Sequence, residues 1–105
     1  MARPERPVDP SAGPLQAFAC DLRALRRQAG SPNYEAMSSA TGKSKTALTQ
    51  AAAGDHLPRW ETLAAYVLAC GGESEQWRVR WEHLRDTLGV HIPGPRRARA
   101  NLAAE

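Results

Sequence analysis

Residues that build metal sites or disulfide frameworks are scarce in this 105-residue chain. It has two cysteines, Cys20 and Cys70, far apart and without a CxxC pair, and three histidines, His56, His83 and His91. None of the histidines has a carboxylate or cysteine partner at the spacing that metal ligands need. We therefore expect no metal site and no cystine framework, and interpret the cysteines as free thiols buried inside helices.

Long apolar runs and catalytic motifs are absent as well. No stretch approaches the ~18 apolar residues of a membrane span. The first residues, MARPERPVDPSAGP, carry charges and prolines where a signal peptide needs an apolar segment. The sequence has no phosphate-binding loop, no Cys–His arrangement and no carboxylate pair in a cleft-like context. These absences predict a cytoplasmic protein that is not an enzyme and uses no cofactor.

Acidic residues are outnumbered, by 14 Lys+Arg to 11 Asp+Glu, and lysine itself is limited to Lys43 and Lys45. The formal net charge of +3 permits a polyanionic partner without requiring one. The preference for arginine, together with abundant alanine, is typical of a high-GC bacterial genome.

Strand-like alternation of apolar and polar residues is also missing, whereas apolar residues recur at helical spacing in five segments. These segments cover about residues 14–29, 34–41, 45–53, 60–70 and 75–88. They predict an all-α domain over residues 14–89. A flexible proline-rich arm at 1–13 precedes it, and a flexible basic tail or linker at 90–105 follows it.

Glycines and small polar residues mark the expected helix ends. Gly42 stops the second helix, Asn33 or Ser31 caps its beginning, and Ser44 and Ser74 cap the third and fifth helices. The residues predicted to face the core are Leu15, Phe18, Ala19, Leu22, Leu25, Ala29, Met37, Ala40, Ala47, Leu48, Ala51, Ala52, Leu57, Trp60, Leu63, Ala64, Val67, Leu68, Trp77, Trp81, Leu84 and Leu88.

The connection between the second and third helices is three or four residues long and contains Gly42. A glycine there can take a positive φ and turn the next helix away steeply, as a helix-turn-helix requires. Met37 and Leu48 can fill the space between these helices, while Ser38 and Ala51 are small enough for close approach. The spacing and residue types together favour a helix-turn-helix.

A longer pattern, T-G-x-S-x-x-x-L-x-x-x-x-x-G-x-x-L-P, begins at this turn and is carried by Thr41, Gly42, Ser44, Leu48, Gly54, Leu57 and Pro58. It resembles the helix-turn-helix of phage-repressor and Cro-like regulators, the XRE type. The following segment, PRWETLAAYVLACGGESEQWRVRWEHLRD, is similar to a form common in actinobacteria, and the resemblance covers roughly residues 3–86. It implies a compact five-helix bundle of the lambda-repressor-like type, whose third helix enters the major groove of double-stranded DNA.

The resemblance also implies which side chains would meet DNA. Base contacts would come from the exposed side of the third helix, from Lys45, Thr46, Thr49 and Gln50. Lysine can donate to guanine, glutamine can pair with adenine, and threonine can place its methyl against thymine. Phosphate contacts would come from helix termini and their neighbours, namely Asn33, Lys43, Ser44, Arg59, Arg26 and Arg27. The structural alternatives are a helix cap for Ser44 and solvent-exposed helix faces for the lysine, glutamine and arginine side chains.

The sequence thus predicts sequence-specific binding of double-stranded DNA by a transcriptional regulator or by the DNA-binding part of one. Such modules usually bind two half-sites as dimers, so we expect a homodimer, formed through the exposed edge of the fifth helix or through a partner domain beyond Glu105. Where relatives often carry arginine, this chain has Gln50, Asp55 and His56, so less positive charge faces the DNA backbone. The alternative is a protein–protein interaction module on the same fold, with weak or no DNA binding of its own.

Overall fold

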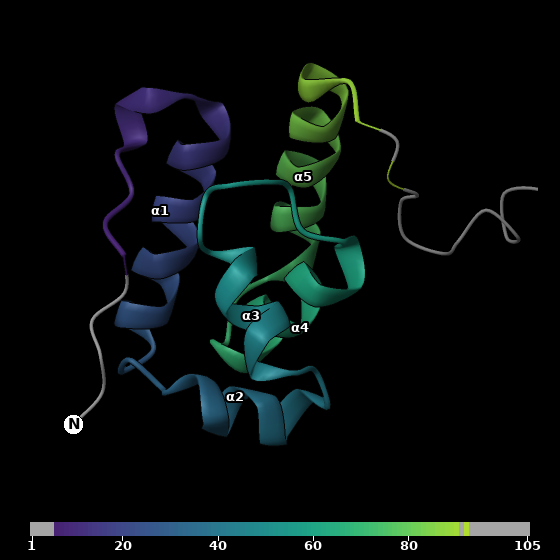
Figure 1. The fold of residues 1–105 in the computed structure, drawn as a ribbon. Coiled ribbons are helices and arrows are strands. Elements are labelled where there is room, and N and C mark those ends of the chain that lie inside the picture. The colour runs from purple at the N-terminus through teal and green to yellow at the C-terminus, as the bar shows by residue number, and fades with distance from the viewer. Residues whose placement is uncertain (1–5, 91, 93–105) are drawn as a thin grey trace, which may run out of the picture.

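The computed structural model of the chain describes residues 6–90 and Ile92 (Figure 1). Within these residues the chain forms a short 3-10 helix and five α-helices, and no strand. The elements are η1 (Pro10–Ala12), α1 (Pro14–Gln28), α2 (Tyr34–Thr41), α3 (Lys45–Ala51), α4 (Trp60–Ala69) and α5 (Ser74–Leu88). The prediction of an all-α protein with five helices is confirmed for this part of the chain.

Most helix ends form where the sequence predicts them. Gly42 takes the left-handed conformation after α2, with φ 79°. The side chain of Asn33 accepts a hydrogen bond from Ala36 N at 2.7 Å, and Ser44 Oγ accepts one from Ala47 N at 3.0 Å. Two details differ from the prediction. The last helix begins at Ser74 itself without a side-chain cap, and α3 ends at Ala51, two residues early.

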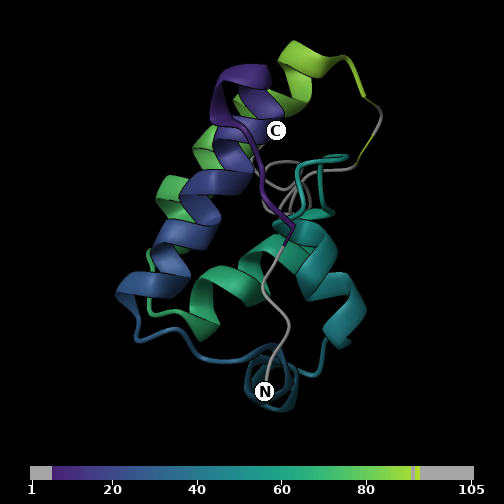
Figure 2. The same ribbon diagram turned by 60° about the vertical axis from the view of Figure 1, so that its left-hand side comes forward.

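The helices pack as a small bundle in which α4 lies at the centre. It contacts α2, α3 and α5, and α2 also contacts α3. In Figures 1 and 2, α2 lies across one end of the molecule, while α1 and α5 extend towards the other end. The rings of Phe18 on α1 and Trp77 on α5 meet edge to face, with centroids 5.4 Å apart. This aromatic contact joins the first helix to the last.

The core follows the predicted apolar stripes on four of the five helices. Trp81 is fully buried, and its indole N–H donates to the carbonyl of Pro58 at 2.8 Å, which satisfies the one polar atom of the ring. Trp77 is buried as well, and Trp60 is half-buried with its ring centre 5.8 Å from that of Trp81. The tryptophans therefore build the core, as the sequence predicts.

The buried side of α4 agrees with the predicted one at Leu63 and Val67, and differs from it at two other residues. Leu68, predicted to face inward, is 64% exposed, whereas Tyr66 is fully buried. Since α4 is apolar on nearly every side, its neighbours decide which face is covered, and they cover the side of Leu63 and Tyr66. The Tyr66 hydroxyl lies 3.2 Å from that of Tyr34, so each ring has a polar partner.

Three further residues predicted to be inward are exposed, and each has a structural reason. Ala29 follows the last residue of α1, Leu88 is the last residue of α5, and Ala40 is the last residue but one of α2. Residues near a helix end have fewer neighbouring elements to cover them, so an apolar stripe overestimates burial there.

The two cysteines are free thiols, as predicted, but only one of them is buried. Burial raises the pKa of the Cys70 thiol. Cys20 is half-buried, and its thiol donates to the carbonyl of Val8 at 3.3 Å, so it fastens the segment before α1 to that helix. Part of this segment forms the 3-10 turn of η1.

Within the described part of the chain, the helices are too short or too polar to cross a membrane. The expected basic tail at 90–105 lies outside the described residues except for Val90 and Ile92. The proposed limits of the arm and of the tail therefore stay predictions.

Candidate functional site

The turn between α2 and α3 is built from contacts between close neighbours in the sequence. Gly42 N donates to the carbonyl of Ser38 at 2.8 Å, which closes α2. Thr41 Oγ1 donates to the carbonyl of Met37 at 2.8 Å and accepts from Lys43 N at 3.2 Å. With the Ser44 cap, these bonds give partners to backbone groups on both sides of the bend that α2 and α3 themselves leave unpaired. The direction in which α3 leaves α2 is therefore determined locally.

Apolar side chains from both helices then anchor this corner in the core. Met37 on α2 and Leu48 on α3 are almost completely buried, and Ala51 and Ala52 are buried beside them. The small alanines allow α3 to approach its neighbours closely, as expected from the sequence. One side of α3 is consequently fixed against α2 and α4.

The opposite side of α3 carries the four residues predicted to contact bases. Lys45, Thr46, Thr49 and Gln50 are all exposed. Among the described residues, these four side chains make no hydrogen bond or ion pair with the rest of the chain. Their donors and acceptors are thus available to a ligand, and none of the seven residues of α3 is acidic.

The residues predicted to contact phosphate fall into two groups. Arg27 and Arg59 are exposed, and Lys43 is half-buried in the turn. Arg59 precedes α4 in the N-cap position, where its side chain makes no capping bond. Within residues 6–90, the side chains of these three cations make no hydrogen bond or ion pair that would compete with a phosphate.

The other predicted phosphate contacts serve inside the fold. The side chains of Asn33 and Ser44 are the caps of α2 and α3. Arg26 Nη1 donates to the carbonyl of Pro32 at 2.7 Å, and its guanidinium lies 4.6 Å from the ring centre of Tyr34. A phosphate contact by Arg26 would compete with these bonds, which hold the corner between α1 and α2.

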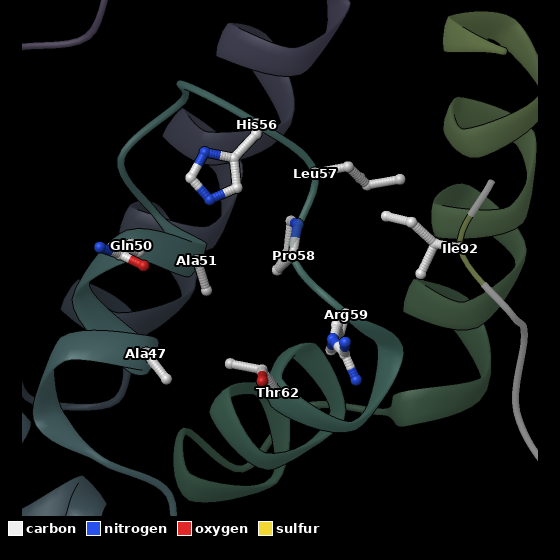
Figure 3. Close-up of a pocket in the computed structure, with 9 residues that line it drawn as sticks. All are labelled: Ala47, Gln50, Ala51, His56, Leu57, Pro58, Arg59, Thr62 and Ile92. Carbon is white, nitrogen blue, oxygen red and sulfur yellow. The ribbon is translucent and has the colours of Figure 1, made fainter. Parts of the chain in front are cut away.

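A groove of about 410 Å³, not expected from the sequence, borders α3 on the side of α4 (Figure 3). In Figure 3, α3 lies on one side of it, the start of α4 below it, and the connecting segment with His56 above it. Apolar side chains make up much of its surface, and its polar members can donate hydrogen bonds. The lining residues are Ala47, Gln50, Ala51, His56, Leu57, Pro58, Arg59, Thr62 and Ile92.

The C-terminal end of α3 is fastened by side chains from the first quarter of the chain, which the sequence analysis missed. Arg23 Nε donates to the carbonyl of Ala52 at 2.7 Å, and Gln16 Nε2 donates to that of Gly54 at 2.9 Å. Arg6 Nη2 donates to the carbonyl of Ala53 at 3.3 Å and pairs with Asp55 Oδ2 at 2.6 Å. No short-range sequence pattern predicts these bonds, since the residues that they join are 29 to 49 positions apart.

Comparison of the chain with models of known protein families, with curated proteins and with solved structures finds no match. The resemblance in the sequence is therefore a hypothesis that the geometry of α2, α3 and their surroundings has to support.

Proposed function

We propose that the chain binds double-stranded DNA sequence-specifically, with α2 and α3 as a helix-turn-helix and α3 in the major groove. It would act as a transcriptional regulator or as the DNA-binding part of one. One observation carries this proposal: α3 is anchored in the core by Leu48 and Ala51, and its other side presents four exposed polar residues without acidic neighbours on that helix.

The dimensions and chemistry of α3 suit a major groove. An α-helix with its side chains is roughly 10–12 Å across, and the major groove is about 12 Å wide. Lys45 can donate to guanine O6 and N7, and Gln50 can pair with the adenine edge through its amide. Thr46 and Thr49 combine a hydroxyl with a methyl that fits against thymine. Each outward side chain therefore has a base edge that it can recognise.

Basic side chains near α3 support contacts with the DNA backbone. Lys43 precedes the helix in the turn, and Arg59, at the start of α4, lies across the groove from α3 (Figure 3). Contacts of this kind position a protein on the duplex, whereas the base contacts provide specificity. Arg27, exposed near the end of α1, is the third candidate.

The test is equilibrium binding to a fluorescent duplex pool of random sequence, measured at several salt concentrations. We expect the logarithm of the affinity to fall linearly with that of the salt concentration, by about 0.9 for each phosphate neutralised. On a duplex sequence selected from this pool by binding, Gln50→Ala should weaken the binding free energy by about 1–3 kcal/mol and relax the preference at one base pair. Gln76→Ala removes an exposed glutamine from α5 and is the matched control. Absence of binding at low salt contradicts the proposal.

A protein–protein interaction module is the second candidate, and the groove beside α3 favours it. That groove has an apolar surface, which double-stranded DNA would not use. The surface is formed by Ala47, Ala51, Leu57, Pro58 and Ile92. The same titration separates the candidates, because a protein-binding module would not lose DNA affinity with salt in proportion to neutralised phosphates.

A further inference from the structure

The segment before α1 lies against the C-terminal end of α3, although the sequence separates them by more than 35 residues. Arg6 pairs with Asp55 there, and its own carbonyl accepts a hydrogen bond from Arg23 Nη1 at 2.6 Å. Val8 is close as well: a Cβ added to Gly54 would lie 3.1 Å from a Val8 methyl. Backbone and side chains thus both hold this segment in place.

Arg6, Arg23 and Asp55 border a hollow that opens next to the proposed base-reading face. Its volume is about 290 Å³, and it is lined by Arg6, Arg23, Thr49, Ala53 and Asp55. Thr49 is one of the four exposed residues of α3, so the hollow continues the surface that would meet DNA.

Asp55 is the unfavourable member of this surface. A carboxylate at this end of α3 adds to the negative end of the helix dipole, and both repel a phosphate backbone. The pair with Arg6 cancels this charge, and the two side chains stay 62% and 58% exposed, within reach of solvent and of a ligand. With Arg23 included, two guanidinium groups face one carboxylate in the hollow.

We propose that Arg6 is a positioning residue of the DNA interface that acts through Asp55, by cancelling a carboxylate that would otherwise repel the DNA backbone beside Thr49. The inference rests on the proposed function and assigns to it a residue outside α2 and α3. It explains how the chain tolerates aspartate at a position where a basic residue would serve DNA binding better.

The experiment compares four forms of the chain on the random-sequence duplex at about 50 mM salt: unaltered, Arg6→Ala, Asp55→Asn and the double variant. Arg6→Ala should lower the affinity roughly three- to tenfold, because it leaves Asp55 charged and unopposed. The loss should shrink at higher salt, since both groups are exposed. Asp55→Asn and the double variant should bind at least as well as the unaltered chain, and Arg6→Lys should restore binding.

Arg80→Ala is the matched control. It breaks another exposed ion pair, Arg80–Asp21 at 2.7 Å, which joins α5 to α1 and involves no residue of α3. It should change the affinity less than twofold. Circular dichroism and thermal unfolding check that each form is folded, and Arg6→Gln and Arg80→Gln replace any alanine variant that is not.

The outcomes separate the inference from the function on which it rests. If the double variant binds as weakly as Arg6→Ala, Arg6 does not act through Asp55 and the inference is overturned. Equal affinity of Arg6→Ala and the unaltered chain overturns it as well, while the proposed function stands. If the unaltered chain binds no duplex even at low salt, the proposed function fails and the inference fails with it.

Discussion

The two ends of α3 are held in contrasting ways. At its beginning, the bonds of the Gly42 turn and of the Ser44 cap join residues no more than four positions apart. At its end, the carbonyls of residues 52–54 accept hydrogen bonds from side chains that lie 29 to 47 positions away. The first end forms from local chemistry, whereas the second exists only once the chain has folded. Each of the following changes tests one side of this comparison or the core that joins both.

Leu48→Ala should have the largest effect, because the side chain is completely buried between the two ends of α3. Loss of a buried leucine leaves a cavity and destabilises a protein by about 2–5 kcal/mol. Urea unfolding followed by circular dichroism measures the change in the free energy of unfolding. Leu68→Ala removes the same group from a largely exposed site on α4 and should change stability by less than about 0.5 kcal/mol. Equal losses would contradict the core described here.

Arg23→Ala tests the long-range end. It removes the donor to the carbonyl of Ala52 and the one to the carbonyl of Arg6. Hydrogen bonds made by a charged group contribute about 1.5–3 kcal/mol, so we expect a loss in this range. Arg27 is an exposed arginine on the same helix, so Arg27→Ala should change the free energy of unfolding by less than about 0.5 kcal/mol. If the two arginine variants unfold alike, this end of α3 is not held by distant side chains and the comparison fails.

Gly42→Ala tests the local end through backbone strain alone. Gly42 has φ 79°, and a Cβ added there would meet no atom within 4 Å. An alanine there should therefore lower the free energy of unfolding by about 1–2 kcal/mol, because of its left-handed backbone conformation and not because of a steric clash. Gly42→Asn is the control, since asparagine tolerates this conformation better. A stability loss as large for asparagine as for alanine would show that something other than φ is at work.

Ser44→Ala should have the smallest effect of the four. It removes the acceptor for Ala47 N, and loss of such a cap costs typically ~1 kcal/mol. Thermal unfolding resolves a change of this size in a small domain. Ser39→Ala, at an exposed position inside α2, should not destabilise the chain, because alanine is the better helix former. If Ser44→Ala left the stability unchanged, local hydrogen bonds would not define the start of α3.

Local signals predicted much of the fold. The caps at Asn33 and Ser44 and the left-handed Gly42 depend on residues within one helical turn, so their side chains reveal them. On α4 the prediction is wrong at Leu68 and misses Tyr66, since a helix that is apolar nearly all round does not reveal which face its neighbours will cover. Contacts with the neighbouring helices bury Tyr66 and leave Leu68 exposed.

The candidate site divides in the same way. The outward placement of Lys45, Thr46, Thr49 and Gln50 could be predicted from the sequence, because burial of Leu48 and Ala51 on one side of a helix turns the remaining positions outward. The groove with Ile92 and the pairing of Arg6 with Asp55 could not. Both depend on where separate segments lie after folding, and surface ion pairs are too weak to leave a pattern in the sequence.

The sequence by itself determined the number of helices, most of their ends and the outward face of α3, since these follow from hydrogen bonds and periodicities that span a few residues. Only the tertiary structure decided which side of α4 is buried, which side chains hold the far end of α3 and what opposes the charge of Asp55. The physical reason is range. Helix periodicity and capping act between near neighbours, whereas packing and long-range hydrogen bonds require the whole chain to be in place.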